Sequence, residues 1–117
     1  MTNLGKNALV HVARDFREAW RDLCEGVLRL ERQAELADMD VYRFDDGGSV
    51  GVVYRDGGLP DLEQYKNSVW LEFEVDDLGG VIAQLAALGM RSLDHFERSH
   101  HYFRGPGGPI FRLAQKT

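Results

Sequence analysis

The chain has 117 residues, of which 44% are hydrophobic and 28% charged, values typical of one globular domain. A formal net charge of −5 argues against nucleic acid as a partner, because phosphate contacts need a basic surface. There is no run of about 20 apolar residues and no apolar stretch after the N-terminus, so we expect neither a membrane partner nor a secretory signal. The single cysteine, Cys24, fits a reducing cytoplasm, where we place the protein.

The first half predicts a strand, a helix and three further strands. Residues 8–13 are a short apolar run of strand type, and Asp15 with Glu18 resembles a capping box at a helix start. The helix face is formed by Phe16, Ala19, Trp20, Leu23 and Val27. We expect Trp20 in the core and Cys24 buried beside it. The later strands are predicted over 32–37, 40–44 and 49–54.

The second half follows a polar connector at residues 55–67. A strand is predicted over 68–75, and its alternation places an apolar set on one face and Trp70, Glu72 and Glu74 on the other. A helix follows over 78–88, with Asp77 as its N-cap. The last strands are predicted over 91–96, 102–104 and 110–114.

The two halves repeat one pattern. Asp15-Phe16 and Asp77-Leu78 are 62 positions apart, and the glycine pairs at 47–48 and 107–108 are 60 apart. The sequence therefore predicts a duplicated βαβββ unit within a single domain of residues 1–117. Unit 1 would span about 6–56 and unit 2 about 68–117, joined by the connector at 55–67.

The second half resembles the vicinal oxygen chelate superfamily, which includes glyoxalase I, extradiol dioxygenases, fosfomycin resistance enzymes and bleomycin resistance proteins. Residues Phe73–Leu78 and Tyr102–Leu113 carry the resemblance, although Gly105 stands where the family usually has aspartate. The resemblance implies an α+β fold in which two tandem βαβββ units form a half-open, barrel-like sheet around a cleft, with helices on the outer face. It also implies a homodimer.

Metal-dependent members of the superfamily bind their ion through His, Glu or Gln at four positions. Carried over to this sequence, those positions are occupied by Ala8, Val52, Trp70 and Arg112, none of which is a ligand. We therefore expect no metal and no other cofactor, and the protein leans away from being an enzyme. His11 has two interpretations: a buried histidine on the helix-facing side, or one turned into the cleft by a bulge.

The predicted cleft has an apolar floor, one aromatic plate and a few charges, as small-molecule sites do. The candidate ligand-binding residues are Val10, Val52, Trp70, Glu72, Glu74 and Arg112. Trp70 would stack on a planar or cationic ligand, while Glu72 would pair either with a ligand amine or with Arg112. The likeness is strongest to the metal-free bleomycin resistance proteins. It predicts a non-catalytic small-molecule binding protein that confers antibiotic resistance by sequestering a drug.

Three alternatives remain open from the sequence. The first is a metal-dependent lyase, isomerase or dioxygenase with His11 and Glu72 among its ligands. The second is metal-free acid–base catalysis by Glu72 or His101. The third is a dimeric interaction module with no small ligand. His95, His100 and His101 form a second histidine group that we interpret as a polar loop.

Overall fold

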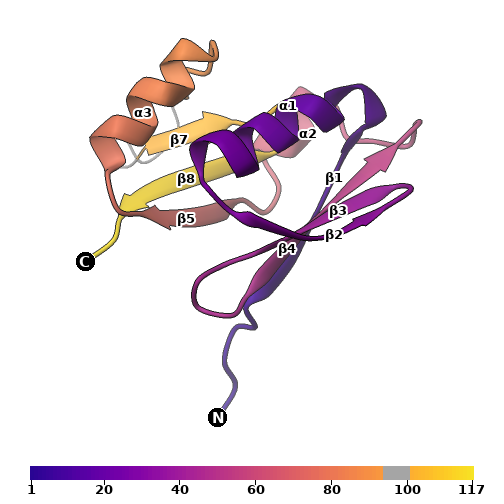
Figure 1. Ribbon diagram of the computed structural model, residues 1–117. Coiled ribbons are helices and arrows are strands. Elements are labelled where there is room, and N and C mark those ends of the chain that lie inside the picture. Colours follow the sequence, from indigo (N-terminus) through magenta and orange to yellow (C-terminus); the bar gives the residue numbers. More distant parts are fainter. Residues whose placement is uncertain (94–100) are drawn as a thin grey trace. The chain divides into compact units, whose positions relative to one another are not determined.

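The computed structural model describes residues 1–93 and 101–117 (Figure 1). The chain divides into two compact units, Met1–Leu59 and Pro60–Thr117. Each unit contains its own open, four-stranded mixed sheet together with short helices, so the fold class is α+β as predicted.

The first unit contains strands β1 (Asn7–Ala13), β2 (Glu31–Leu36), β3 (Met39–Arg43) and β4 (Ser49–Arg55). Its sheet order is β1-β4-β3-β2, with β1 parallel to β4 and the other pairs antiparallel. Every one of these strands lies within one residue of its predicted bounds. Short runs of strand-type residues and the tight turn at residues 45–48 explain this agreement.

The helical segment of the first unit is less regular than predicted. It begins as a 3-10 turn, η1 (Arg14–Phe16), continues as α1 (Arg17–Arg21) and ends as a π-helix, η2 (Asp22–Val27). The predicted capping box at Asp15 and Glu18 is wrong, because no side chain caps either segment. The chain passes directly from β1 into the turn, so Asp15 already lies inside it.

The second unit repeats this topology. Its elements are α2 (Leu62–Lys66), β5 (Leu71–Val75), α3 (Leu78–Ala87), β6 (Ser92–Leu93), β7 (His101–Arg104) and β8 (Ile110–Gln115). The sheet order is β5-β8-β7-β6, and β5 is parallel to β8 just as β1 is to β4. The matching strand orders confirm the predicted duplication. Of the strand predicted over 91–96, residues 94–96 lie outside the described residues, as do His95 and His100.

The short helix α2 lies within the segment expected to be a connector, and sequence reasoning missed it. Asp61 and Gln64 form a reciprocal capping box, with both hydrogen bonds 2.8 Å long. Tyr65 is buried against Gly108 of the β7–β8 hairpin, where a Cβ would overlap its ring. Arg104 Nη1 donates to the Leu62 carbonyl at 3.0 Å. These contacts hold α2 on the sheet of its own unit.

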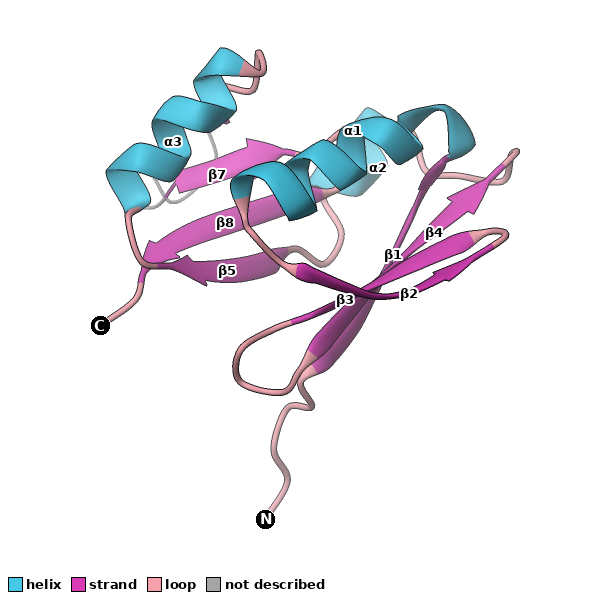
Figure 2. Ribbon diagram, viewed as in Figure 1, coloured by secondary structure: helices cyan, strands magenta, loops and turns pink. Residues whose placement is uncertain are grey.

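Helix α3 was predicted correctly and covers one face of the second sheet (Figure 2). Asp77 caps it by accepting from the Gly80 N–H at 3.1 Å, and Gly89 ends it with φ +85°. Phe111 packs between Phe73 and Phe103, with ring centroids 5.7 Å away in each case. No helix among the described residues is long and apolar enough to cross a membrane.

The core of the first unit confirms two predictions and overturns another. Trp20 is 1% exposed and Cys24 is fully buried, as expected. Val10 and Val52 were predicted to face a cleft, and that facing is wrong. Val52 pairs with Asp40, whose carboxylate bonds to α1, so the face that holds Val52 and its partner Val10 is the one that α1 covers. Val10 is 8% exposed and Val52 is fully buried.

Candidate ligand-binding face

The face of the second sheet turned away from α3 carries aromatic and charged side chains, and we call it the aromatic face. Its members are Trp70, Glu72, Glu74, Tyr102, Ile110 and Arg112. Gln115 identifies the other face, because its side-chain oxygen accepts from the Leu78 N–H at 3.0 Å. Arg112 is an odd number of residues from Gln115 along β8, so its side chain projects from the opposite side of the sheet. Glu72 is the register partner of Arg112 and therefore shares that side.

Arg112 lies at the centre of the aromatic face. Its Cζ is 4.6 Å from the ring centroid of Trp70 and 5.8 Å from that of Tyr102. The two rings are nearly perpendicular, at 88°, with centroids 5.4 Å apart. Such distances are those of cation–π contacts and of an edge-to-face aromatic pair. The alternation of residues 68–75 predicted that Trp70 shares a face with Glu72, and its contact with Arg112 agrees with that prediction, although Trp70 precedes β5.

The charge of Arg112 is balanced by Glu72, the pairing that the sequence left open as one of two alternatives. Arg112 Nε donates to Glu72 Oε2 at 2.6 Å, and Nη2 pairs with the same oxygen. The Arg112 and Glu72 side chains are 19% and 33% exposed, so the pair is only partly screened by water. Burial opposes the charge, but the hydrogen bonds to Glu72 and Tyr102 outweigh it and raise the pKa of Arg112.

Tyr102 is a member of this face that sequence reasoning missed. It is fully buried, and Arg112 Nη1 reaches its hydroxyl oxygen at 3.4 Å, a long contact. A signal was present, because the glycine-rich turn at 105–109 fixes the β7–β8 register and places Tyr102 directly opposite Arg112. His101, the alternative acid–base candidate, pairs with Leu113 and therefore lies on the α3 side.

The first unit has its own charged cluster, and this cluster faces the helix. Asp40 is fully buried and accepts four hydrogen bonds: two from Arg21 at 2.9 Å, one from Arg17 at 3.0 Å and one from the Tyr54 hydroxyl at 2.9 Å. Burial alone would raise the pKa of Asp40, but these donors hold it at about 2. The cluster ties α1 to the sheet.

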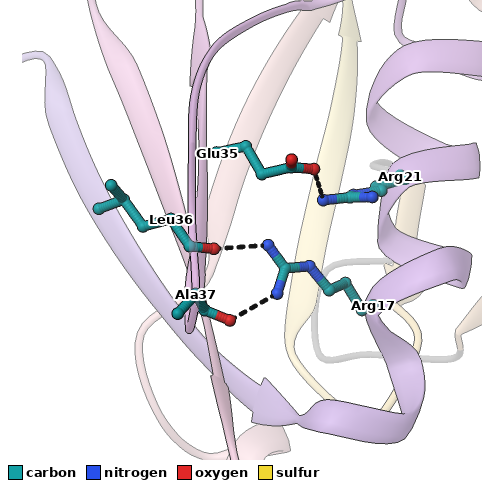
Figure 3. A pocket seen from close by; sticks show the side chains of 5 residues that line it. All are labelled: Arg17, Arg21, Glu35, Leu36 and Ala37. Atoms are coloured by element: carbon teal, nitrogen blue, oxygen red, sulfur yellow. Dashed lines mark hydrogen bonds and ion pairs between the residues drawn. The ribbon is translucent and has the colours of Figure 1, made fainter.

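An open hollow of about 470 Å³ lies beside this cluster, between α1 and the β2–β3 hairpin (Figure 3). Arg17 points at two backbone carbonyls, those of Leu36 and Ala37, at 2.8 Å each, and Arg21 faces Glu35. The terminal nitrogens of Arg17 and the side chains of Arg21 and Glu35 are thus engaged within the hollow, whereas Arg17 Nε is buried without a hydrogen-bond partner among the described residues. We interpret it as the seam between helix and hairpin.

Cys24 lies in the same core and is no nucleophile. Burial, with the nearby charge of Glu25 as the next cause, raises the pKa of its thiol to about 12. The Tyr42 hydroxyl donates a hydrogen bond to Glu25 Oε2 at 2.7 Å. A thiolate would be strongly disfavoured at neutral pH in these surroundings.

The face of the first sheet turned away from α1 carries apolar side chains around Gly51. Leu9 and Met39 lie over Gly51, and His11 projects from the same face because Val10 and Val12 occupy the other. His11 therefore does not lie on the helix-facing side, so the first of its two interpretations is wrong, and β1 contains no bulge of the kind that the second required. Its cross-strand partner is Val53, whose side chain has no atom that could bind a metal ion.

A divalent metal does not fit the donor set of the described residues. They contain no group of three or more His, Cys, Asp or Glu residues that could hold an ion. On the aromatic face, the positions carried over from metal-dependent proteins hold an indole and a guanidinium. The one carboxylate between them, Glu72, is bound by Arg112.

Comparisons with known proteins place the fold. No protein family matches the chain, and no curated protein matches it significantly. Solved structures do match over nearly the whole chain. A protein of Bacillus anthracis described as of the glyoxalase family has a TM-score of 0.72 at 11% identity, covering 100% of this chain and 98% of its own. A glyoxalase/bleomycin resistance protein of Albidiferax ferrireducens has a TM-score of 0.70 at 18% identity, with coverages of 98% and 100%.

A third structure belongs to the same group. A fosfomycin resistance protein of Listeria monocytogenes has a TM-score of 0.69 at 14% identity, covering 100% of this chain and 96% of its own. The chain has the vicinal oxygen chelate fold. The expected fold is thereby confirmed for the strand order of each unit. Sequence identities this low support a shared fold but do not indicate a shared activity.

Proposed function

We propose that the protein binds a planar small molecule against the aromatic face and acts by sequestering it, in the manner of the glyoxalase/bleomycin resistance type. The observation that carries the proposal is the arrangement around Arg112: two perpendicular rings with one charge pair. Ligand sites combine apolar area with a few oriented polar groups in this way. Val10 and Val52 are not part of the proposed site, because they lie under α1.

The fold neighbours agree with this proposal without deciding it. Two of the three structures described above carry resistance in their names, for fosfomycin and for bleomycin. The donor set adds a second line of support, because the aromatic face offers stacking and charge where metal-dependent relatives would offer ligands. Glu74, on the same face and exposed, supplies a further negative charge for a ligand amine.

Isothermal titration calorimetry with benzamidinium, 2-naphthoate and quinoline tests the proposal, since these probes are planar and differ in charge. We expect at least one to bind wild type, and Trp70→Leu to weaken that binding at least tenfold. Phe16→Leu removes a partly exposed ring from the first unit and serves as the matched control, with unchanged affinity expected. Mass spectrometry of the recovered probe should find it chemically unchanged. Equal binding by wild type and Trp70→Leu, or no binding of any probe, contradicts the proposal.

The metal-dependent alternative has one observation in its favour, the direction of His11. It predicts an activity that requires an added divalent ion and disappears in His11→Ala. The aromatic-face proposal predicts instead that His11→Ala leaves probe binding unchanged. Elemental analysis showing near-stoichiometric zinc, iron, manganese or nickel in the purified protein would favour the alternative.

We also propose that the protein is a homodimer, as the resemblance implies. Strands β1 and β5 lie at sheet edges, and native proteins commonly cover or otherwise protect such edges, for which a second chain is one way. Light scattering should report twice the mass of one chain at micromolar concentration. A monomer mass under those conditions would rule the dimer out.

A further inference from the structure

We infer that Trp70, Tyr102 and Glu72 form a binding site for a guanidinium or amidinium group, and that Arg112 is its resident occupant. The inference deepens the proposed function by naming the ligand class, planar delocalised cations, and the way in which such a ligand must enter. A cation takes the position between Trp70, Tyr102 and Glu72 only by exchanging with Arg112. That position is therefore occupied by a side chain of the same chain.

The geometry around Arg112 provides the three contacts that such a cation uses. One ring lies under the guanidinium at 4.6 Å, and a second ring stands at 88° to the first and 5.8 Å from the cation. Glu72 supplies the counter-charge through one oxygen that accepts from two nitrogens of Arg112. A flat cation with several N–H donors satisfies all three contacts, whereas a compact ammonium cannot span them.

The sequence position of the occupant strengthens the inference. Arg112 comes from β8 and Glu72 from β5, and the two are direct register partners in the sheet. Tyr102 comes from the strand on the other side and is the register partner of Arg112. Strand pairing thus fixes two of the walls, Glu72 and Tyr102, and Trp70 directly precedes β5, while the occupant reaches the site through a flexible side chain. Removing that side chain should leave the walls in place.

Chemical rescue of Arg112→Ala tests the inference directly. The probe is guanidinium chloride from 0 to roughly 50 mM, far below denaturing concentrations, with sodium chloride keeping the ionic strength constant. The readout is the indole N–H signal of Trp70 in two-dimensional NMR spectra, with the buried Trp20 as an internal reference for the fold. We expect a saturable shift of the Trp70 signal in Arg112→Ala, at concentrations at least tenfold lower than any response of wild type.

Two further variants complete the experiment. Arg104→Ala removes another arginine of the β7–β8 hairpin, one that bonds to backbone carbonyls, and its Trp70 signal should not respond. Adding Glu72→Gln to Arg112→Ala should weaken guanidinium binding at least fivefold, because the counter-charge is lost. If Arg112→Ala fails to fold, Arg112→Gln replaces it with the same expectation.

The inference is overturned if guanidinium leaves the Trp70 signal of the Arg112 variants unmoved, or if wild type responds at the same concentrations. Its failure is distinguishable from failure of the proposed function. Rescue of Arg112→Ala without binding of any planar probe to wild type would support the site and refute sequestration. Probe binding to wild type without guanidinium rescue would do the reverse.

Discussion

In the first unit, the arginine–carboxylate cluster lies under the helix, whereas in the second unit it lies on the opposite face of an equivalent sheet. Asp40 binds two arginines of the helical segment and is fully buried. Glu72 binds Arg112 from the neighbouring strand and is one-third exposed. In the first unit the arginine–carboxylate cluster therefore holds a helix on the sheet. In the second unit, in our proposal, the corresponding ion pair belongs to a ligand-binding site.

Each cluster also includes a tyrosine ring next to an arginine, so the main difference between the clusters is the burial of the carboxylate. Arg17 lies 4.7 Å from the ring centroid of Tyr54, and Arg112 lies 5.8 Å from that of Tyr102. Because Asp40 is fully buried and Glu72 is one-third exposed, removing the carboxylate should lower the free energy of unfolding far more in the first unit than in the second. Four predictions compare the two units, in order of decreasing effect.

Asp40→Ala should destabilise the protein most, by about 3 kcal/mol, because it removes a fully buried acceptor from the half-buried Arg17 and Arg21 and from the Tyr54 hydroxyl. Urea unfolding at pH 7 measures the loss. Glu72→Ala is the matched variant on the exposed side and should cost about 1 kcal/mol or less. Similar losses in the two variants would show that the clusters do not differ as described.

Gly108→Ala should cost about 3 kcal/mol. Its φ is +132°, and the added Cβ would overlap the buried ring of Tyr65, so backbone strain and overpacking act together. Gly47, in the corresponding hairpin of the first unit, has φ +92° with nothing within 4 Å. Gly47→Ala should therefore show the strain alone, about 1 kcal/mol. Equal losses in urea unfolding would mean that Tyr65 does not hold the second hairpin.

Acid should remove about 2 kcal/mol of stability through Asp40, because its pKa in the fold is about 2 against an ordinary value of 3.8. A lowered carboxyl pKa stabilises the fold above the ordinary value, and this contribution disappears as the pH falls through about 2. Urea unfolding of wild type and Asp40→Asn from pH 7 to pH 2 should show stabilities that converge in acid. Parallel curves would contradict the assignment.

Helix capping should differ between the units by a smaller amount. Asp77→Ala should cost about 1 kcal/mol, because it leaves the Gly80 N–H without its acceptor. Asp15→Ala, at the position of the failed capping box, should stay within about 0.5 kcal/mol of wild type. Thermal unfolding of both variants measures the contrast, and a large effect at Asp15 would restore the original prediction.

The faces of the two sheets show what the sequence could and could not predict. In β5, charged residues alternate with apolar ones, so the facing of Glu72 was readable and correct. In β1 and β4, both faces are largely apolar, so no alternation separates Val10 from Leu9. The facing of Val10 and Val52 was instead carried over from the repeat offsets, where a slip of one residue reverses every side chain.

Other features depended on contacts that a linear pattern does not contain. The Asp40 cluster needs a helix and a hairpin that meet only after folding, and single charges in the sequence give no sign of it. Helix α2, by contrast, had a local signal in Asp61 and Gln64 that went unnoticed inside a polar stretch. Tyr102 joined the candidate site only once the β7–β8 register was known.

The most direct test of the account follows the two indole N–H signals of wild type by NMR during titration with benzamidinium, 2-naphthoate and quinoline. Trp20 is buried in the first unit, and Trp70 lies on the aromatic face of the second. We predict that at least one probe shifts the Trp70 signal in a saturable way while the Trp20 signal stays fixed. A probe that moves Trp20 alone, or a Trp70 signal that no probe moves, would contradict the assignment of ligand binding to the aromatic face.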